Sequence, residues 1–113
     1  MSSTGYARVA APPVPARLVG VAGPVAGQTF ALKAETRIGR SIANDVVIPS
    51  ALLSRGHARI IYAVDCWMLQ DLGSTSGSCV NGKQARSVEL AEGNIVRLGD
   101  AELRFERVPP GHN

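Results

Sequence analysis

The sequence predicts an all-β protein, a β-sandwich of two mainly antiparallel sheets with loops gathered at one end. From Arg17 onward, short segments rich in Val, Ile, Leu and Phe recur, and Gly, Pro, Asn and Asp separate them at close intervals. No segment shows the apolar spacing of a helix of about ten residues. The chain of 113 residues fits one domain, and its 45% hydrophobic content supplies one core, built mainly of aliphatic side chains around Trp67.

The expected strands follow one another closely along the chain. They are residues 16–22, 28–32, 36–39, 45–48, 57–63, 66–72, 78–80, 87–90, 94–98 and 102–108. The stretch "GPVAG" at 23–27 predicts a turn between the first two, because Gly and Pro favour turns. Asn81 and Gly82 predict a second turn at residues 78–86, since Asn-Gly favours a tight hairpin with positive φ values.

The last expected strand indicates which of its faces is buried. Leu103 and Phe105 alternate with Glu102, Arg104 and Glu106. Successive side chains of a strand point to opposite faces of a sheet, so the apolar pair should face the core and the charged residues the solvent.

The two ends of the chain differ in composition from the middle. Residues 1–15 contain three prolines among Ala, Ser and Gly, and such a segment buries too little apolar surface to offset its ordering entropy. We therefore expect a flexible tail at 1–15, a folded domain at 16–108 and a fraying end at 109–113.

Charge and cysteine content exclude several classes of protein. The net charge of +3 is scattered, so neither a nucleic acid nor an anionic membrane is expected as a partner. Cys66 and Cys79 are too few for a secreted disulfide framework and form no CxxC pair, so no metal or cofactor is expected. Without a signal-peptide pattern or a membrane-length apolar stretch, we expect a soluble, cytoplasmic protein. The bias towards Ala, Val, Gly and Arg indicates a bacterial source.

Three expected loops carry the residues that suit a binding site. They are "GRSIAND" at 39–45, "SALLSRGH" at 50–57 and "DLGSTSGSCVNG" at 71–82. Together they offer arginine, several hydroxyls, and glycines that let backbone N–H groups approach a ligand. A phosphate monoester has close to two negative charges and three acceptor oxygens, and it requires this combination of donors. The loops therefore predict an anion pocket.

The order "IGR…ND…SRGHA…W.L.DLGSTSG…VNG…L..G..V.LG" resembles a forkhead-associated (FHA) domain over about residues 17–108. Members of that family are β-sandwiches that bind phosphothreonine peptides through loops at one edge. The resemblance implies a non-catalytic binding module in Ser/Thr kinase signalling. Its partner would be a phosphothreonine-containing protein, either a kinase substrate or the autophosphorylated kinase.

The resemblance also assigns roles to individual residues. It implies that Arg40 clamps the phosphate and that Ser54 donates its hydroxyl to a phosphate oxygen. Thr75 corresponds to the loop hydroxyl beside the phosphate, and Arg55 to a position that contacts the phosphate or the peptide backbone. Leu52 lies where the family contacts a side chain downstream of the phosphothreonine, which predicts an apolar preference there.

Five further positions are expected to support the site rather than touch the ligand. Gly39 and His57 match positions that the family uses architecturally, with His57 holding two recognition loops together through hydrogen bonds. Gly77 belongs to the Gly-rich wall of the pocket. Asn81 and Gly82 form the turn that follows the site.

The chain departs from the family pattern after "GST". The family reads Asn-Gly-Thr there, whereas this chain has Ser76, Gly77 and Ser78. Ser76 is shorter than Asn and replaces an amide by one hydroxyl, so one or two hydrogen bonds to the peptide, worth about 0.5–1.5 kcal/mol each, are expected to be lost. Ser74, in the same loop, is either a further phosphate contact or a turn residue.

Three other hypotheses remain open from the sequence. A nucleophilic triad of Ser54, His57 and Asp71 would make the protein an enzyme, but no GxSxG elbow, P-loop or metal cluster accompanies it. Asp71 is better explained as an acceptor for backbone N–H groups of its loop. A degenerate FHA-like scaffold would make phosphate-independent contacts and would tolerate Arg40→Ala. Finally, Thr4 in the tail could, once phosphorylated, occupy the protein's own site.

Overall fold

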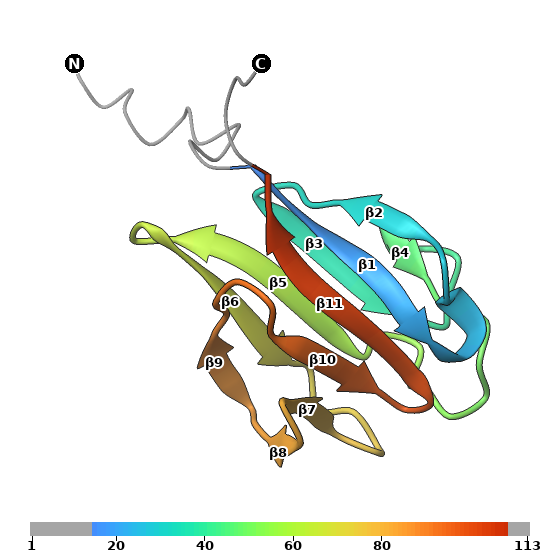
Figure 1. The fold of residues 1–113 in the computed structure, drawn as a ribbon. Coiled ribbons are helices and arrows are strands. Elements are labelled where there is room, and N and C mark those ends of the chain that lie inside the picture. Colours follow the sequence, from blue (N-terminus) through green and yellow to red (C-terminus); the bar gives the residue numbers. More distant parts are fainter. Residues whose placement is uncertain (1–14, 109–113) are drawn as a thin grey trace.

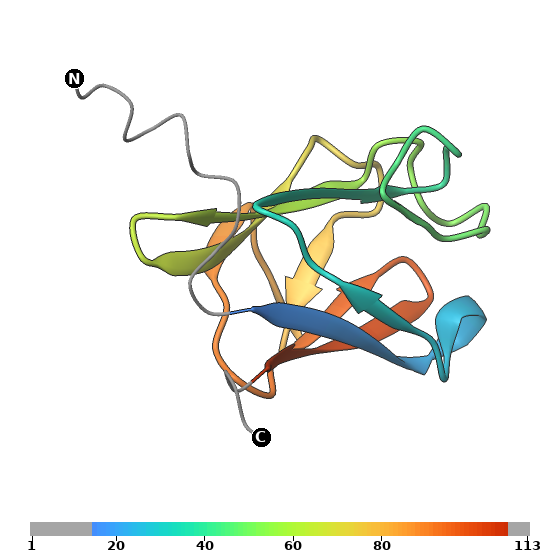
Figure 2. The same cartoon turned by 90° about the horizontal axis from the view of Figure 1, so that it is seen from above.

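The computed structural model describes residues 15–108, which form a β-sandwich of two sheets packed face to face (Figures 1 and 2). The first sheet has the spatial order β2 (Thr29–Ala31), β1 (Ala16–Ala22), β11 (Ala101–Arg107), β10 (Ile95–Leu98), β7 (Ser78–Val80) and β8 (Lys83–Gln84). The second has the order β4 (Val46–Val47), β3 (Glu35–Gly39), β5 (Ala58–Ala63), β6 (Cys66–Asp71) and β9 (Ser87–Glu89). The predicted fold class is confirmed.

All neighbouring strands pair antiparallel except β3 and β4, where Ile38 lies opposite Val46 in a parallel register. The only helix among residues 15–108 is the short 3-10 turn η1 (Gly23–Val25), which joins β1 to β2. No helix in this described part is long and apolar enough to cross a membrane.

The core lies between the two sheets and gathers around Trp67. The Trp67 ring packs edge-on against Tyr62, with ring centroids 5.1 Å apart, and lies 6.2 Å from the ring of Phe105. Leu103 and Phe105 are fully buried, as their alternation in the sequence predicts. Each such side chain contributes about 1.5–3 kcal/mol by leaving water. This rigid body fixes the positions from which the loops start.

The described chain begins and ends at the same end of the sandwich, because Ala16 of β1 lies opposite Arg107 of β11. At the other end, Gly99 in the β10–β11 turn lies under the loop after β4. A Cβ atom at Gly99 would approach Leu53 Cδ1 to 2.8 Å, and the Ser50 hydroxyl donates to Asp100 at 2.6 Å. The expected tails at 1–15 and 109–113, apart from residue 15, lie outside the described residues.

The predicted hairpin at 78–86 is present, with β7 and β8 joined by Asn81 and Gly82 at φ values of 51° and 83°. The Asn81 side chain accepts a hydrogen bond from the Ile95 N–H at 2.8 Å and so fixes the turn against β10. After the hairpin the chain crosses to the second sheet, where β9 pairs with β6. The crossing brings residues 84–86 back to the end of β6.

Candidate functional site

Backbone hydrogen bonds join the loop after β3 to the loop before β5. The Arg40 N–H donates to the Ser54 carbonyl at 3.1 Å, and the Ser41 N–H donates to the Arg55 carbonyl at 3.2 Å. The Asn44 side chain crosses between the loops and donates to the same Arg55 carbonyl at 2.7 Å. The two loops therefore form one surface.

Gly39 permits this close approach. A Cβ atom at Gly39 would lie 2.1 Å from the Arg55 carbonyl oxygen and 2.9 Å from Asn44 Nδ2. Both atoms are held by hydrogen bonds, so neither can move aside cheaply. A side chain at this position would push the two loops apart.

His57 is fully buried and joins the second loop to the third, residues 72–77. Its Nδ1 accepts a hydrogen bond from the Ser54 N–H at 3.1 Å, and its Nε2 lies 2.8 Å from the Gly77 carbonyl. Because Nδ1 accepts, Nε2 carries the proton and donates. The same residue bonds the third loop through its own carbonyl, which accepts from the Leu72 N–H.

The Asp71 carboxylate organises the third loop from within. One oxygen accepts the Ser74 and Ser78 hydroxyls at 2.6 and 2.7 Å, and the other accepts the N–H groups of Gly73 and Ser74. Burial alone would raise the pKa of Asp71, but these hydrogen bonds outweigh it and hold the pKa below its ordinary value.

Gly77 completes the loop in a conformation that glycine favours, with φ of 83°. Its N–H donates to the Ser74 hydroxyl at 2.9 Å. The Ser74 hydroxyl therefore accepts from Gly77 and donates to Asp71. In this structure Ser74 shapes the loop, and its hydroxyl hydrogen is not directed at a ligand.

Several polar groups of the three loops are left without partners among residues 15–108. Arg40 and Arg55 are exposed and form no ion pair with any of residues 15–108. Arg40 Nε donates to the Leu53 carbonyl at 3.1 Å, which orients the guanidinium and leaves its terminal nitrogens open. The Ser54 hydroxyl oxygen accepts the Thr75 N–H at 2.9 Å, so the hydroxyl hydrogen remains available.

Thr75, Ser76 and Leu52 flank this group. Thr75 is exposed, and its hydroxyl has no hydrogen bond within residues 15–108. Ser76 donates its hydroxyl to the Leu52 carbonyl at 3.0 Å, which ties the third loop to the second. The Leu52 side chain is 58% exposed. A row of open donors thus lies beside one exposed apolar side chain.

Comparison with known proteins shows which family the chain belongs to. The model of the FHA domain matches residues 36–99 of the chain. The chain belongs to the FHA domain family. The resemblance drawn from the loop motifs is therefore confirmed.

Relatives within the family include proteins of mycobacteria. The transcriptional regulatory protein EmbR of Mycobacterium tuberculosis is 39% identical over 82 residues, which are 71% of this chain and 21% of EmbR. This chain spans between 8% and 23% of the length of EmbR and of two further curated relatives.

Solved FHA domains share the fold. EmbR in complex with a low-affinity phosphopeptide superposes with a TM-score of 0.78 at 34% identity, over 88% of this chain and 26% of that one. A domain solved in a study of phosphothreonine-dependent FHA interactions superposes with a TM-score of 0.77 at 30% identity. The match covers 84% of this chain and 98% of that one. The FhaA FHA domain of M. tuberculosis, bound to the intracellular domain of Rv3910, superposes with a TM-score of 0.73 at 29% identity. The match covers 80% of this chain and 99% of that one.

The FHA domain geometry does not assemble the triad that the sequence left open. The Ser54 hydroxyl bonds to Thr75, whereas His57 Nδ1 accepts from the Ser54 backbone N–H. Asp71 accepts from serine hydroxyls and N–H groups of its own loop. No group of three or more His, Cys, Asp or Glu side chains within residues 15–108 could hold a metal ion. Cys66 and Cys79 are free thiols.

Two features of this FHA domain were not assigned from the sequence. Asn44 joins the first two loops, although its letters "ND" were part of the recognised pattern. Ser78 is fully buried and holds Asp71 through a hydrogen bond, although it was noted only as a departure from threonine. Asn81 and Gly82 shape the hairpin and do not bond to the three loops.

Proposed function

We propose that this FHA domain binds phosphothreonine peptides in Ser/Thr kinase signalling and performs no catalysis. The observation that carries the proposal is that the Arg40 guanidinium, the Ser54 hydroxyl and the Arg55 guanidinium keep open donors on two adjoining loops that hydrogen bonds hold together. The phosphopeptide complex of EmbR and the partner complex of FhaA support it.

We assign each group a distinct task in this proposal. A phosphate monoester at this surface meets the Arg40 guanidinium, whose terminal nitrogens donate in a fork to two of its oxygens. The Ser54 hydroxyl donates to a third oxygen, because its hydrogen has no acceptor among residues 15–108. Arg55 adds a second positive charge. The His57 hydrogen bonds keep the loops in place before the ligand arrives, which lowers the ordering cost of binding.

Selectivity would come from the surroundings of the phosphate. By analogy with the family, the domain should prefer phosphothreonine to phosphoserine if a small apolar niche takes up the extra methyl group. The exposed Leu52 side chain favours an apolar residue downstream of it. A small loop-built site of this kind gives micromolar affinity, about 8 kcal/mol.

Titration with degenerate peptide libraries, read by fluorescence anisotropy, tests the proposal. Matched phosphothreonine, phosphoserine and threonine libraries are compared on the wild type, on Arg40→Ala and on Arg107→Ala. Arg107 is a matched control because it is also exposed but lies at the opposite end of the sandwich. We expect binding of phosphothreonine alone, lost in Arg40→Ala and kept in Arg107→Ala.

The contrary result would be informative as well. Equal binding of a partner by wild type and Arg40→Ala would support a degenerate scaffold that makes phosphate-independent contacts. The observation that favours this second candidate is Ser76, whose hydroxyl is bonded to the Leu52 carbonyl and replaces the amide of the family pattern.

The partner is proposed to be a kinase substrate or the kinase itself, in the cytoplasm of a bacterium. Thr4 is a further candidate ligand, which would switch the domain off when phosphorylated, and it lies outside the described residues. Its test is NMR of a kinase-phosphorylated sample. Shifts at Arg40 and Ser54 are expected, and unchanged shifts would end the idea.

A further inference from the structure

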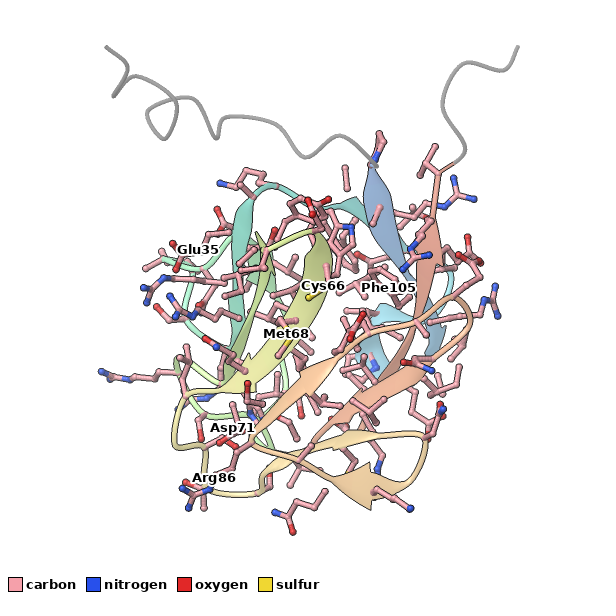
Figure 3. The ribbon with its side chains drawn as sticks, turned by 90° about the vertical axis from the view of Figure 1, so that its left-hand side faces the viewer. Glu35, Cys66, Met68, Asp71, Arg86 and Phe105 are labelled. Atoms are coloured by element: carbon pink, nitrogen blue, oxygen red, sulfur yellow. The ribbon has the colours of Figure 1, made fainter. Side chains whose placement is uncertain are left out.

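A second opening adjoins the candidate phosphate site. A hollow of about 660 Å³ lies between the third loop, 72–77, and the segment that follows β8. The residues that line it come from these two segments, from Gln84 of β8 and from the adjoining ends of β6 and β7, and not from the loops that carry Arg40 and Ser54. Figure 3 shows Asp71 and Arg86 at the same corner of the molecule, at the end of β6.

Thr75 is shared by the two openings. Its backbone N–H donates to the Ser54 hydroxyl on the phosphate side, and the residue also lines the hollow. A peptide whose phosphate lies against Ser54 therefore needs to extend only past Thr75 to enter the hollow. This part of the peptide would run away from Leu52, because the loop of Leu52 contributes no residue to the lining of the hollow.

Polar groups without partners in this hollow indicate that it could bind an anion. Arg86 is exposed, and its guanidinium forms no ion pair or hydrogen bond with any other residue in the described range. Its backbone is nevertheless fixed, because the Arg86 carbonyl accepts the Asp71 N–H at 2.8 Å. The Gln84 amide passes over the bare Cα of Gly77, where a Cβ atom would lie 2.3 Å from Gln84 Nε2. That amide also has no hydrogen bond within residues 15–108.

The one acidic group in the lining forms no ion pair with Arg86. The Asp71 carboxylate accepts four hydrogen bonds from residues 73–78. An incoming anion therefore meets a free guanidinium and a free amide, whose backbone is held beside the third loop by hydrogen bonds from Asp71 and to Ser78.

We infer that this hollow is a second anion subsite, in which Arg86 and Gln84 hold an acidic side chain a few residues from the phosphothreonine of the same peptide. The inference rests on the proposed phosphothreonine function. The acidic group is a carboxylate or a second phosphate, since a guanidinium and an amide suit both.

A peptide series tests the subsite. Starting from one phosphothreonine peptide with neutral flanks, Glu or phosphoserine is placed in turn at each neighbouring position, with Gln or Ser as the matched neutral residue. Wild type, Arg86→Gln and Arg107→Gln are compared. On one side of the phosphothreonine, we expect the acidic residue to tighten binding by about five- to twentyfold in wild type and Arg107→Gln. Arg86→Gln should lose this gain but still bind the neutral peptide as wild type does. The ratio of the Glu and phosphoserine gains identifies the preferred anion.

A second measurement separates this inference from the proposed function. Inorganic phosphate is titrated into labelled Arg40→Ala protein while the arginine Nε–H signals are followed by NMR. We expect a saturable shift at Arg86 and none at Arg107. If neutral phosphothreonine peptides bind but acidic flanks give no gain and Arg86 does not shift, the subsite is wrong and the proposed function stands. If no phosphopeptide binds but Arg86 shifts, the hollow binds an anion, but the proposed function and the role of the hollow in peptide binding are both wrong.

Discussion

The two ends of the sandwich are ordered by different means. At the end that carries the candidate site, long loops are fixed by polar side chains, above all the buried His57 and the half-buried Asp71. At the other end, β5 and β6 are joined by the two-residue turn of Val64 and Asp65, which has φ values of 51° and 63°. The far end therefore depends on strand register and tolerates an unfavourable residue, whereas the site end depends on a few polar contacts.

This difference between the two ends predicts where phosphopeptide binding and folding stability are coupled. Substitutions that break the polar contacts of the site end should lower stability and phosphopeptide affinity together. Substitutions at the far end should change stability alone. Four predictions test this contrast.

His57→Ala should have the largest effect. It removes the acceptor of the Ser54 N–H and the donor to the Gly77 carbonyl and leaves a cavity, which costs about 2–4 kcal/mol. Thermal unfolding followed by circular dichroism should show a melting temperature lower by roughly 10–25 °C. Phosphopeptide affinity should also fall at temperatures where the variant is folded. Unchanged affinity in a destabilised variant would contradict the coupling.

Asp71→Asn should follow, at a cost of about 2 kcal/mol at neutral pH, because hydrogen bonds to a charged acceptor are lost. The pKa of Asp71 is lower in the folded protein than its ordinary value, so its contribution is present above about pH 4 and is lost as the pH falls through the folded pKa.

Denaturant unfolding across this pH range checks the prediction. The gap in unfolding free energy between wild type and Asp71→Asn should narrow as the solution becomes acidic. Asp65→Asn, in the exposed turn at the far end, is the matched control and should show little difference from wild type. A constant gap would mean that the Asp71 charge does not stabilise the loop.

Ser76→Asn restores the residue of the family pattern. We expect binding of a phosphothreonine peptide about fivefold tighter, since an amide can add one or two hydrogen bonds to the peptide. Anisotropy titration measures the change, with the unphosphorylated peptide as control. Equal or weaker binding would contradict the hypothesis that Ser76 lowers the affinity of the site.

Val64→Asn should have the smallest effect and the opposite sign. A β-branched residue at positive φ is strained, and the Val64 side chain is 93% exposed, so little burial is lost. The variant should gain about 0.5–1 kcal/mol, a rise of roughly 2–8 °C in melting temperature, with phosphopeptide affinity unchanged. A change in affinity would mean that the two ends are not independent.

Most of the fold could be predicted from the sequence because strand signals are local. Alternation located β11, and Asn-Gly located the hairpin of β7 and β8. Strand order could not be predicted, because pairing joins residues distant in the chain. The crossing of β9 from that hairpin to β6 in the other sheet is an example.

The residues of the candidate site were likewise predicted only in part. The motifs pointed to Arg40 and Ser54, whose residue types suit phosphate directly. Asn44 and Ser78 were not assigned roles, because each acts on a distant backbone or carboxylate group that the sequence does not place nearby. The hollow beside Thr75 was not foreseen either, since Arg86 reaches it only through the return of the hairpin.

The short outer strands limit the contacts that other polypeptides can make with the edges of the two sheets. The four sheet edges are β2, β8, β4 and β9, which are 3, 2, 2 and 3 residues long. Such edges offer few free N–H and C=O groups, so another polypeptide cannot readily extend either sheet. The domain is thereby protected against aggregation by edge-to-edge pairing.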